Sequence, residues 1–270
     1  MMHKYEAADT RKAFTLVELL VVIAIIGIIS TISIPAIRGL TQSNALAAGH
    51  RQLMDDIGLA RQYAINGHRT VYMVFMPPSL GAHFAKISAS GSQGAPIYLR
   101  LMTNLLNYTL TGYSILTFRN TGDQPGQHNP HYLIEWRNLP DGVFVATNKF
   151  QDVNALQFNT WPDSTRPFPY ANFPFPLGSQ YGQGKVDTSM RMPYIAFDPS
   201  GQLHYDPPFR PQFPDQVIKL TRGSIFYPRD NIGNYMVAGG PDVVVTASTN
   251  TAVRVNWLTG RPRVEGMDLQ

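Results

Sequence analysis

The stretch of sequence that decides the fold lies near the N-terminus and reads Arg11-Lys12-Ala13-Phe14-Thr15-Leu16-Val17-Glu18-Leu19. It opens an apolar run over residues 14–37 in which Glu18 is the one charged side chain. At about 1.5 Å per helical residue, this run is long enough to cross a hydrocarbon core of about 30 Å. A charged group inside such a segment is costly, so Glu18 needs either a place near the interface or a partner.

Basic residues before the apolar run predict its orientation. Lys4, Arg11 and Lys12 precede the run, and basic residues before a first span favour a cytoplasmic N-terminus. We therefore expect a single inner-membrane crossing, with residues 1–13 in the cytoplasm and the chain after about residue 38 exported. A cleaved secretory signal peptide is the alternative, but this run is longer than the usual apolar region of about 7–15 residues and contains Glu18.

These residues resemble the N-terminus of type IV prepilins and pseudopilins, which have a basic leader, a small residue, then Phe-Thr-Leu-x-Glu and a long apolar helix. Here the small residue is Ala13, where the family usually has Gly, and the motif is Phe14-Thr15-Leu16-Val17-Glu18. Gly27 and Pro35 also stand where pilin helices commonly carry Gly and Pro. The resemblance implies that a prepilin peptidase cuts between Ala13 and Phe14 and that the new amine of Phe14 is then methylated.

By the same resemblance, Glu18 pairs in lipid with the cationic amine of Phe14 from an adjacent subunit. Two charges that are each costly in lipid become tolerable together, so this pair would set the register between subunits. The alternative is that Glu18 lies about one turn inside the membrane edge and reaches the interface without a partner. On the first interpretation, pairing at Glu18 depends on cleavage after Ala13.

An amphipathic helix over residues 38–67 is predicted to continue the transmembrane helix. Apolar residues recur every three or four positions, which is typical of one helix face: Ile37, Leu40, Leu46, Leu53, Met54, Ile57, Ala60 and Ala64. Asn66-Gly67 is a favourable stop, because both residues tolerate the left-handed conformation. Pro35 is expected to kink the helix, because proline removes a backbone donor.

Residues 68–270 are predicted to form an exported β-rich head. Runs of β-branched and aromatic residues are typical of antiparallel strands; they lie at 70–76, 113–119, 132–137, 142–147, 194–198, 216–221, 243–247 and 252–258. Asp198-Pro199-Ser200-Gly201 predicts a type I turn in a hairpin over 195–205, and Thr259-Gly260 predicts a second turn. Because the helix over 38–67 must cover the apolar face of the sheet, the expected fold class is α+β and pilin-like.

Three segments resemble the GspH/FimT type of minor pseudopilin. They are the end of the predicted helix, with its Ala60-Arg61-x-x-Ala64-Ile65 pattern, and the segments 197–201 and 254–264. Pro262 stands where this family prefers a β-branched residue. Because proline cannot donate to a strand ladder, we expect the last strand to lie at a sheet edge.

The chain is long for a minor pseudopilin, and the excess lies at about 77–192. This region is rich in Pro, Gly, Asn and Gln, so it is predicted to be a loop-rich insertion. Aromatic residues alternate with prolines over 168–176. They either form an exposed contact patch for a partner or fold back as a lid over the sheet, and the lid is the favoured interpretation.

Composition and motifs argue against several classes of function. The chain has no cysteine, so an exported head of this kind is held by packing alone. The net charge of +4 is diffuse, and we expect Arg254, Arg261 and Arg263 to lie on a solvated strand face, so nucleic acid is not an expected partner. His128 and His131 are not expected to form a metal site, because they have no nearby acid or thiol to complete a ligand set. A phosphate loop is not expected at Gly178, Gly182, Gly184 and Lys185, because no Ser or Thr follows the lysine.

The expected function is that of a minor pilin or pseudopilin, a structural subunit of a type II secretion pseudopilus or type IV pilus-like filament. Its expected partners are the prepilin peptidase, other pilin or pseudopilin subunits and inner-membrane lipid. No enzymatic activity, metal or cofactor is expected. The alternative is a membrane-tethered exported protein that uses a prepilin N-terminus and binds a ligand or surface through its head.

The mass of the mature N-terminal peptide tests the processing step directly. We expect protein purified from membranes of its native host to begin at Phe14 and to carry one added methyl group on its amine. Peptide mass spectrometry reads both features at once. An intact Met1, or a cut at any other bond, would be incompatible with this prediction.

Overall fold

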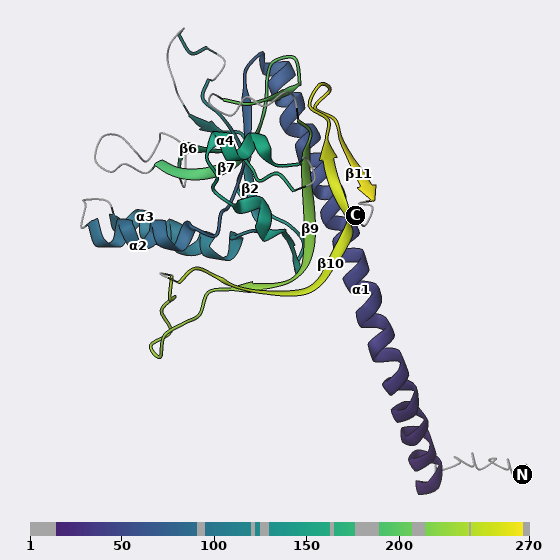
Figure 1. The fold of residues 1–270 in the computed structure, drawn as a ribbon. Helices are drawn as coiled ribbons and strands as arrows, with labels where there is room; N and C mark the ends of the chain where they lie inside the picture. The colour runs from purple at the N-terminus through teal and green to yellow at the C-terminus, as the bar shows by residue number, and fades with distance from the viewer. Residues whose placement is uncertain are drawn as a thin grey trace, which may run out of the picture. The chain divides into compact units, whose positions relative to one another are not determined.

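The computed structural model describes residues 15–90, 95–119, 122–124, 130–162, 165–175, 189–206, 214–237 and 239–266. The chain divides into two compact units, Met1–Asn44 and Ala45–Gln270. Helix α1 (Leu16–Gly67) contributes residues to both units (Figure 1). Ala13 and Phe14 lie outside the described residues. Pro35 lies within α1, but its side chain lies outside the described part, so the kink stays a prediction.

Within the described residues, the strands of the second unit form two antiparallel sheets (Figure 1). The first sheet is built around β1 (Val71–Phe75), which pairs with β2 (Gly112–Thr117) on one side and β7 (Ser189–Phe197) on the other. Its strand order is β3-β2-β1-β7-β6, while β4 also pairs with β2 and β8 with β7. These remaining strands are β3 (His131–Tyr132), β4 (Arg137–Asn138), β6 (Tyr170–Pro174) and β8 (Leu203–His204).

The second sheet has the strand order β11-β10-β9-β5. Its two central strands, β9 (Gln216–Phe226) and β10 (Asp242–Val255), are the long ones. The outer strands are β5 (Val143–Val145) and β11 (Pro262–Gly266). Pro262 therefore lies on an edge strand, as predicted, where a missing N–H is tolerated.

The alternation of side chains along β1 places two hydrophobic clusters on opposite faces of the first sheet. Val71, Met73 and Phe75 belong to the first cluster, which also contains inward side chains of the second sheet. The last part of α1 supplies Leu53, Ile57, Ala60 and Ala64 to this cluster, all fully buried. Helix α1 thus covers the apolar face of the first sheet, which confirms the predicted packing of helix on sheet.

The second cluster lies on the other face of the first sheet and contains Tyr72, Val74 and Met76. It is covered by helices that the sequence analysis did not predict. These are α2 (Leu80–Ser90), α3 (Ala95–Leu105) and the 3₁₀ turn η1 (Leu106–Tyr108), whose buried apolar residues are Leu80, Ile87, Met102 and Leu106. Further along the chain lie the 3₁₀ turn η2 (Thr147–Phe150) and α4 (Ala155–Thr160).

The prediction of a loop-rich insertion at 77–192 is wrong over its described residues. The region contains α2, α3 and α4, and it supplies strands on both sides of β1. Three prolines of the region lie at or just before helix starts. Pro77 and Pro78 precede α2, and Pro96 is the second residue of α3, in the first turn where a missing N–H costs no intrahelical bond.

The aromatic segment is part of the core over residues 168–175, which excludes the alternative of an exposed patch there and agrees with the favoured interpretation that these side chains fold inward. Residues 170–174 of this segment form β6, which pairs with β7. Phe168 and Phe75 stack in the first cluster, with their ring centroids 4.6 Å apart, while Phe173 and Phe175 are buried in the second. The segment is a sheet strand with its flanks rather than a separate lid, and the prolines alternate with side chains that point inward.

Two strand predictions differ from the observed elements. The run 132–137 is not one strand, because its two ends form the short strands β3 and β4 against β2. The runs 243–247 and 252–258 belong to one strand, β10, which ends at Val255. Its register against β9 shifts between Val245 and Ala247 and again between Ser248 and Ala252. These irregularities contain the polar residues that separated the two predicted strands.

A buried polar network holds α1 against the first sheet. The carboxylate of Asp56, which is 4% exposed, accepts hydrogen bonds from Tyr113 Oη at 2.6 Å and from Arg137 NH1 at 2.7 Å. Gln52 Nε2 donates to Tyr113 Oη at 2.8 Å. Burial and the neighbouring Asp56 raise the pKa of Tyr113, so its hydroxyl stays protonated and remains the donor.

Helix α1 ends at Gly67, as Asn66-Gly67 predicted, but the left-handed residue is His68. The His68 N–H donates to Ile65 O at 3.3 Å and the Arg69 N–H donates to Ala64 O at 3.2 Å. This is the Schellman pattern, in which the residue after the cap is usually Gly. His68 adopts φ +47°, a conformation that costs a side-chain-bearing residue free energy.

Both predicted turns are confirmed, and they meet at the end of α1. Gly201 N donates to Asp198 O at 2.9 Å and closes the hairpin of β7 and β8. Gly260, at φ +61°, forms the turn between β10 and β11. Arg61 Nε donates to Thr259 O at 2.7 Å. The three segments with the GspH/FimT resemblance are therefore brought to one place in the fold.

Replacing Gly260 by Ala tests how much the head depends on this meeting point. A Cβ at this position would lie 2.0 Å from Gly201 O, on a residue that is already left-handed. We expect Gly260→Ala to lower the free energy of unfolding by at least about 2 kcal/mol, measured by chemical denaturation.

Gly58→Ala is the matched control, since a Cβ at Gly58 meets nothing within 4 Å. Because Gly58 lies inside α1, this control is expected to be neutral or to stabilise by up to about 1 kcal/mol. Equal stabilities for Gly260→Ala and the unchanged protein would show that the two turns do not depend on close backbone contact.

Candidate functional site

Thr15 and Glu18 form a reciprocal hydrogen-bonded pair at the start of α1. The Glu18 Oε2 atom accepts from Thr15 N at 2.9 Å and from Thr15 Oγ1 at 2.8 Å, while Glu18 N donates to Thr15 Oγ1 at 3.2 Å. Thr15 directly precedes the helix and Glu18 is its third residue. This arrangement is a capping box, which satisfies backbone donors that a helix start leaves unpaired.

A role for Glu18 was predicted from the sequence, whereas the role of Thr15 was not. The signal was present, because Thr-x-x-Glu before an apolar run is the spacing of a capping box. The motif residues therefore have a function within one chain, in addition to any function between subunits.

The other polar side chains near the start of α1 are also bonded within the helix. Between residues 15 and 31 the polar side chains are Thr15, Glu18, Ser30 and Thr31. Ser30 Oγ donates to Ile26 O and Thr31 Oγ1 donates to Ile28 O, each at 2.7 Å. Each of these four side chains thus has a partner in its own helix, which is what an environment without water requires.

The surface of this part of α1 is apolar on every side. Large apolar side chains over 16–29 are between 45% and 79% exposed; they are Leu16, Val17, Leu19, Leu20, Val21, Val22, Ile23, Ile25, Ile26, Ile28 and Ile29. A helix that is apolar all round is normally covered by protein or lipid. Among the described residues, however, no helix is both long and apolar enough to cross a membrane, so the span over 14–37 stays a prediction.

The structure places the predicted site residues as follows. Glu18 lies at the helix start, with its carboxylate turned toward Thr15. Ala13 and Phe14 lie outside the described residues, so the predicted cleavage, methylation and pairing with Phe14 stay predictions.

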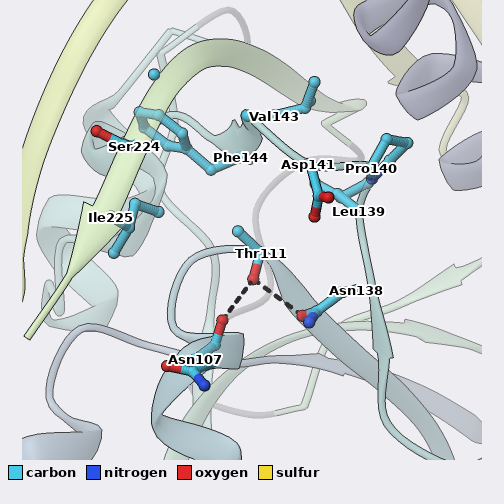
Figure 2. A pocket seen from close by; sticks show the side chains of 12 residues that line it. Asn107, Thr111, Asn138, Leu139, Pro140, Asp141, Val143, Phe144, Ser224 and Ile225 are labelled. Atoms are coloured by element: carbon cyan, nitrogen blue, oxygen red, sulfur yellow. Dashed lines mark hydrogen bonds between the residues drawn. The ribbon is translucent and has the colours of Figure 1, made fainter.

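The head contains a hollow of about 270 Å³ beside β5 and the last part of β9 (Figure 2). On one wall, the Thr111 hydroxyl lies 3.0 Å from Asn138 Oδ1 and 3.4 Å from Asn107 O. Apolar side chains such as Phe144 and Ile225 form the opposite wall. Its lining includes the carboxylate of Asp141 and no Lys or Arg side chain.

A second hollow, of about 340 Å³, lies where α1 meets the first sheet. Its lining residues are His68, Arg69, Thr70, Tyr72, Phe118, Arg119 and Pro199. These side chains combine cationic groups with aromatic rings and include no carboxylate.

Arg254 and Arg263 are engaged within the second sheet. Arg254 Nε lies 2.5 Å from Glu265 Oε2 and Arg254 NH1 lies 3.4 Å from Asp215 Oδ2, while Arg263 NH2 lies 2.5 Å from Glu265 Oε1. This pairing fits the predicted solvated strand face better than a nucleic-acid surface. His131 lies on β3 and His128 lies outside the described residues; within the described part, no group of three or more His, Asp or Glu side chains is placed to hold a metal.

A family model for the prokaryotic N-terminal methylation motif matches residues 9–34. The match contains Ala13, Phe14 and Glu18 and supports a type IV pilin-like protein. Comparison with curated proteins and with solved structures finds no match.

Changing Thr15 tests the capping box. Thr15→Val keeps the shape of the side chain but removes its hydroxyl, so the first turn of α1 should fray. We expect amide hydrogen exchange at Glu18 to become severalfold faster in micelle-solubilised protein. Thr15→Ser retains the hydroxyl and should exchange like the unchanged protein. Equal exchange for Val and Ser would mean that the hydroxyl does not stabilise the helix start.

Proposed function

We propose that this protein is a minor pilin or pseudopilin, a structural rather than enzymatic subunit of a type II secretion pseudopilus or type IV pilus-like filament. In this proposal a prepilin peptidase cuts between Ala13 and Phe14, the amine of Phe14 is methylated, and the subunit assembles through its N-terminal helix. The observation that carries the proposal is the start of α1, where a capping box at Thr15 and Glu18 opens a helix surface that is apolar on every side.

In this proposal, the exposed apolar surface over 16–29 is covered by two environments in succession. Before assembly, inner-membrane lipid covers it, with the N-terminus in the cytoplasm and the head in the periplasm or outside the cell. After assembly, the same surface of neighbouring subunits covers it. Ser30 and Thr31 suit both environments, because their hydroxyls are bonded to the helix backbone and require no water.

The capping role of Glu18 is compatible with pairing between subunits. Both hydrogen bonds from Thr15 end on Oε2, and a carboxylate has acceptor positions on both of its oxygens. Glu18 is therefore able to hold its own helix start through Oε2 while Oε1 accepts the amine of Phe14 from an adjacent subunit. Such a pair would offset the cost of carrying either charge into lipid.

The convergence at the end of α1 supports the GspH/FimT type within this class. Arg61, the turn at Gly201 and the turn at Gly260 come from three separate segments with that resemblance, and they are in contact. The alternative of a membrane-tethered binding protein loses its main sequence argument, because the aromatic side chains at 168–175 are buried.

Substitutions at Glu18 separate the two roles of this residue. Glu18→Gln retains an acceptor for the capping box but removes the charge, since Glu and Gln both serve at this position. Glu18→Ala removes both. We expect both variants to be made and inserted, and both to lose filament assembly and secretion in the native host, because the proposal requires the charge.

Glu135→Gln is the matched control, because Glu135 is exposed on the head and the same charge is removed there. It should assemble normally. If Glu18→Gln assembles normally while Glu18→Ala fails, the residue acts as a cap and pairing is excluded. Normal assembly of both variants would remove the support that Glu18 gives to the proposed function.

A further inference from the structure

The hollow at the end of α1 is cationic at its rim and aromatic inside. His68, Arg69 and Arg119 supply the rim, and Tyr72 and Phe118 supply the rings. The two rings meet edge to face, with centroids 5.4 Å apart. Its volume of about 340 Å³ lies within the range of small-molecule sites.

The two arginines are arranged differently. Arg69 NH1 donates to the Arg119 backbone carbonyl at 2.9 Å, which ties the helix end to the end of β2. The Arg119 side chain is exposed and, within the described part of the chain, has no hydrogen bond or ion pair. An arginine beside an aromatic ring offers a planar fork that matches a carboxylate or phosphate.

The carboxylate of Asp206 lies at the phenol end of Tyr72. Asp206 Oδ1 is 3.5 Å from Tyr72 Oη and 3.1 Å from His204 Nε2. Asp206 is thus engaged with these two groups, and the lining of the hollow contains two arginines and no carboxylate.

The backbone at the rim is held in a costly conformation. His68 occupies the position after the helix cap at φ +47°, where Gly would be the stable choice. Its side chain is exposed and lines the hollow. Residues held in such conformations cluster at functional sites, because a side chain that function requires is retained despite the cost of the conformation.

We propose that this hollow binds an oxyanion, a carboxylate or a phosphate, that is attached to a flat apolar group. Arg119 and His68 hold the anion at the rim, and the flat group packs against Phe118 and Tyr72. This site is independent of the assembly surface on α1, since all its lining residues belong to the head.

Ligand-observed ¹⁹F NMR on the micelle-solubilised full chain tests the proposal with defined probes. 4-Fluorobenzoate and 4-fluorophenyl phosphate carry both features, and comparing them shows which oxyanion is preferred. 4-Fluorobenzyl alcohol has the ring without the charge, and acetate and inorganic phosphate are charged competitors without a ring. We expect at least one of the first two to bind, and each of the other three to bind about tenfold more weakly or not at all.

Two variants and a control locate the binding. Arg119→Gln should lower the affinity for the bound probe by about tenfold. Arg100 is an exposed arginine on α3 outside the hollow, and Arg100→Gln should leave that affinity within about twofold of the unchanged protein. His68→Gly should weaken the probe and at the same time raise the melting temperature of the head. A merely structural role for His68 would give the second effect without the first.

Several results would overturn the proposal. These are no binding of either aromatic anion, equal binding of 4-fluorobenzyl alcohol, equal binding of a ringless anion, or an unchanged affinity in Arg119→Gln. An equal loss in Arg100→Gln would show attraction to overall charge and would also overturn it.

Discussion

The head depends on one packing constraint, which is the burial of the last turns of α1 against both sheets. Leu53, Ile57, Ala60 and Ala64 supply the apolar stripe of this contact. The small side chains of Ala60 and Ala64 let the strands approach α1 closely. Gly49 also permits a close approach, since a Cβ there would lie 3.1 Å from Val143 Cγ1. Apolar burial alone is not directional, however. The bonds of Asp56 with Tyr113 and Arg137 fix the rotation of α1 about its axis and its position along the first sheet. Any other placement would leave a buried carboxylate unpaired, which is strongly destabilising.

The first part of α1 differs from the last turns, because its apolar side chains are exposed. Its apolar side chains over 16–29 find no cover within the described chain, while its polar groups are satisfied internally. In water this combination is unfavourable, because it exposes apolar area and offers few polar groups in return. In lipid or between like helices it is favourable. The motif at Thr15 and Glu18 therefore serves the helix start first, and any intersubunit pair must use the acceptor capacity that the cap leaves.

The sequence predicted the parts of the fold that local chemistry determines. The apolar stripe of α1, the Asp198-Pro199-Ser200-Gly201 turn and the edge position of Pro262 each follow from side-chain periodicity or backbone geometry. Two kinds of feature were missed. Polar residues inside β10 divided it into two predicted strands, because a register shift leaves no periodic signal. Prolines near α2 and α3 looked like loop markers, although a helix start tolerates them. At the candidate site, the hollow near His68 joins residues from β1, from the segments that follow α1 and β2, and from the β7–β8 turn, so only tertiary structure reveals it.

The two faces of the first sheet pack against different parts of the head. The face with Val71, Met73 and Phe75 packs on α1 and on the second sheet, so a change there disturbs the packing of α1 against both sheets. The face with Tyr72 and Val74 is covered by α2, α3 and η1, all from the region 77–192. Elements can be added on that face without moving α1, because the intervening sheet separates the two clusters. The properties that distinguish this head are therefore expected on the second face, and Tyr72 extends from that cluster into the cationic hollow.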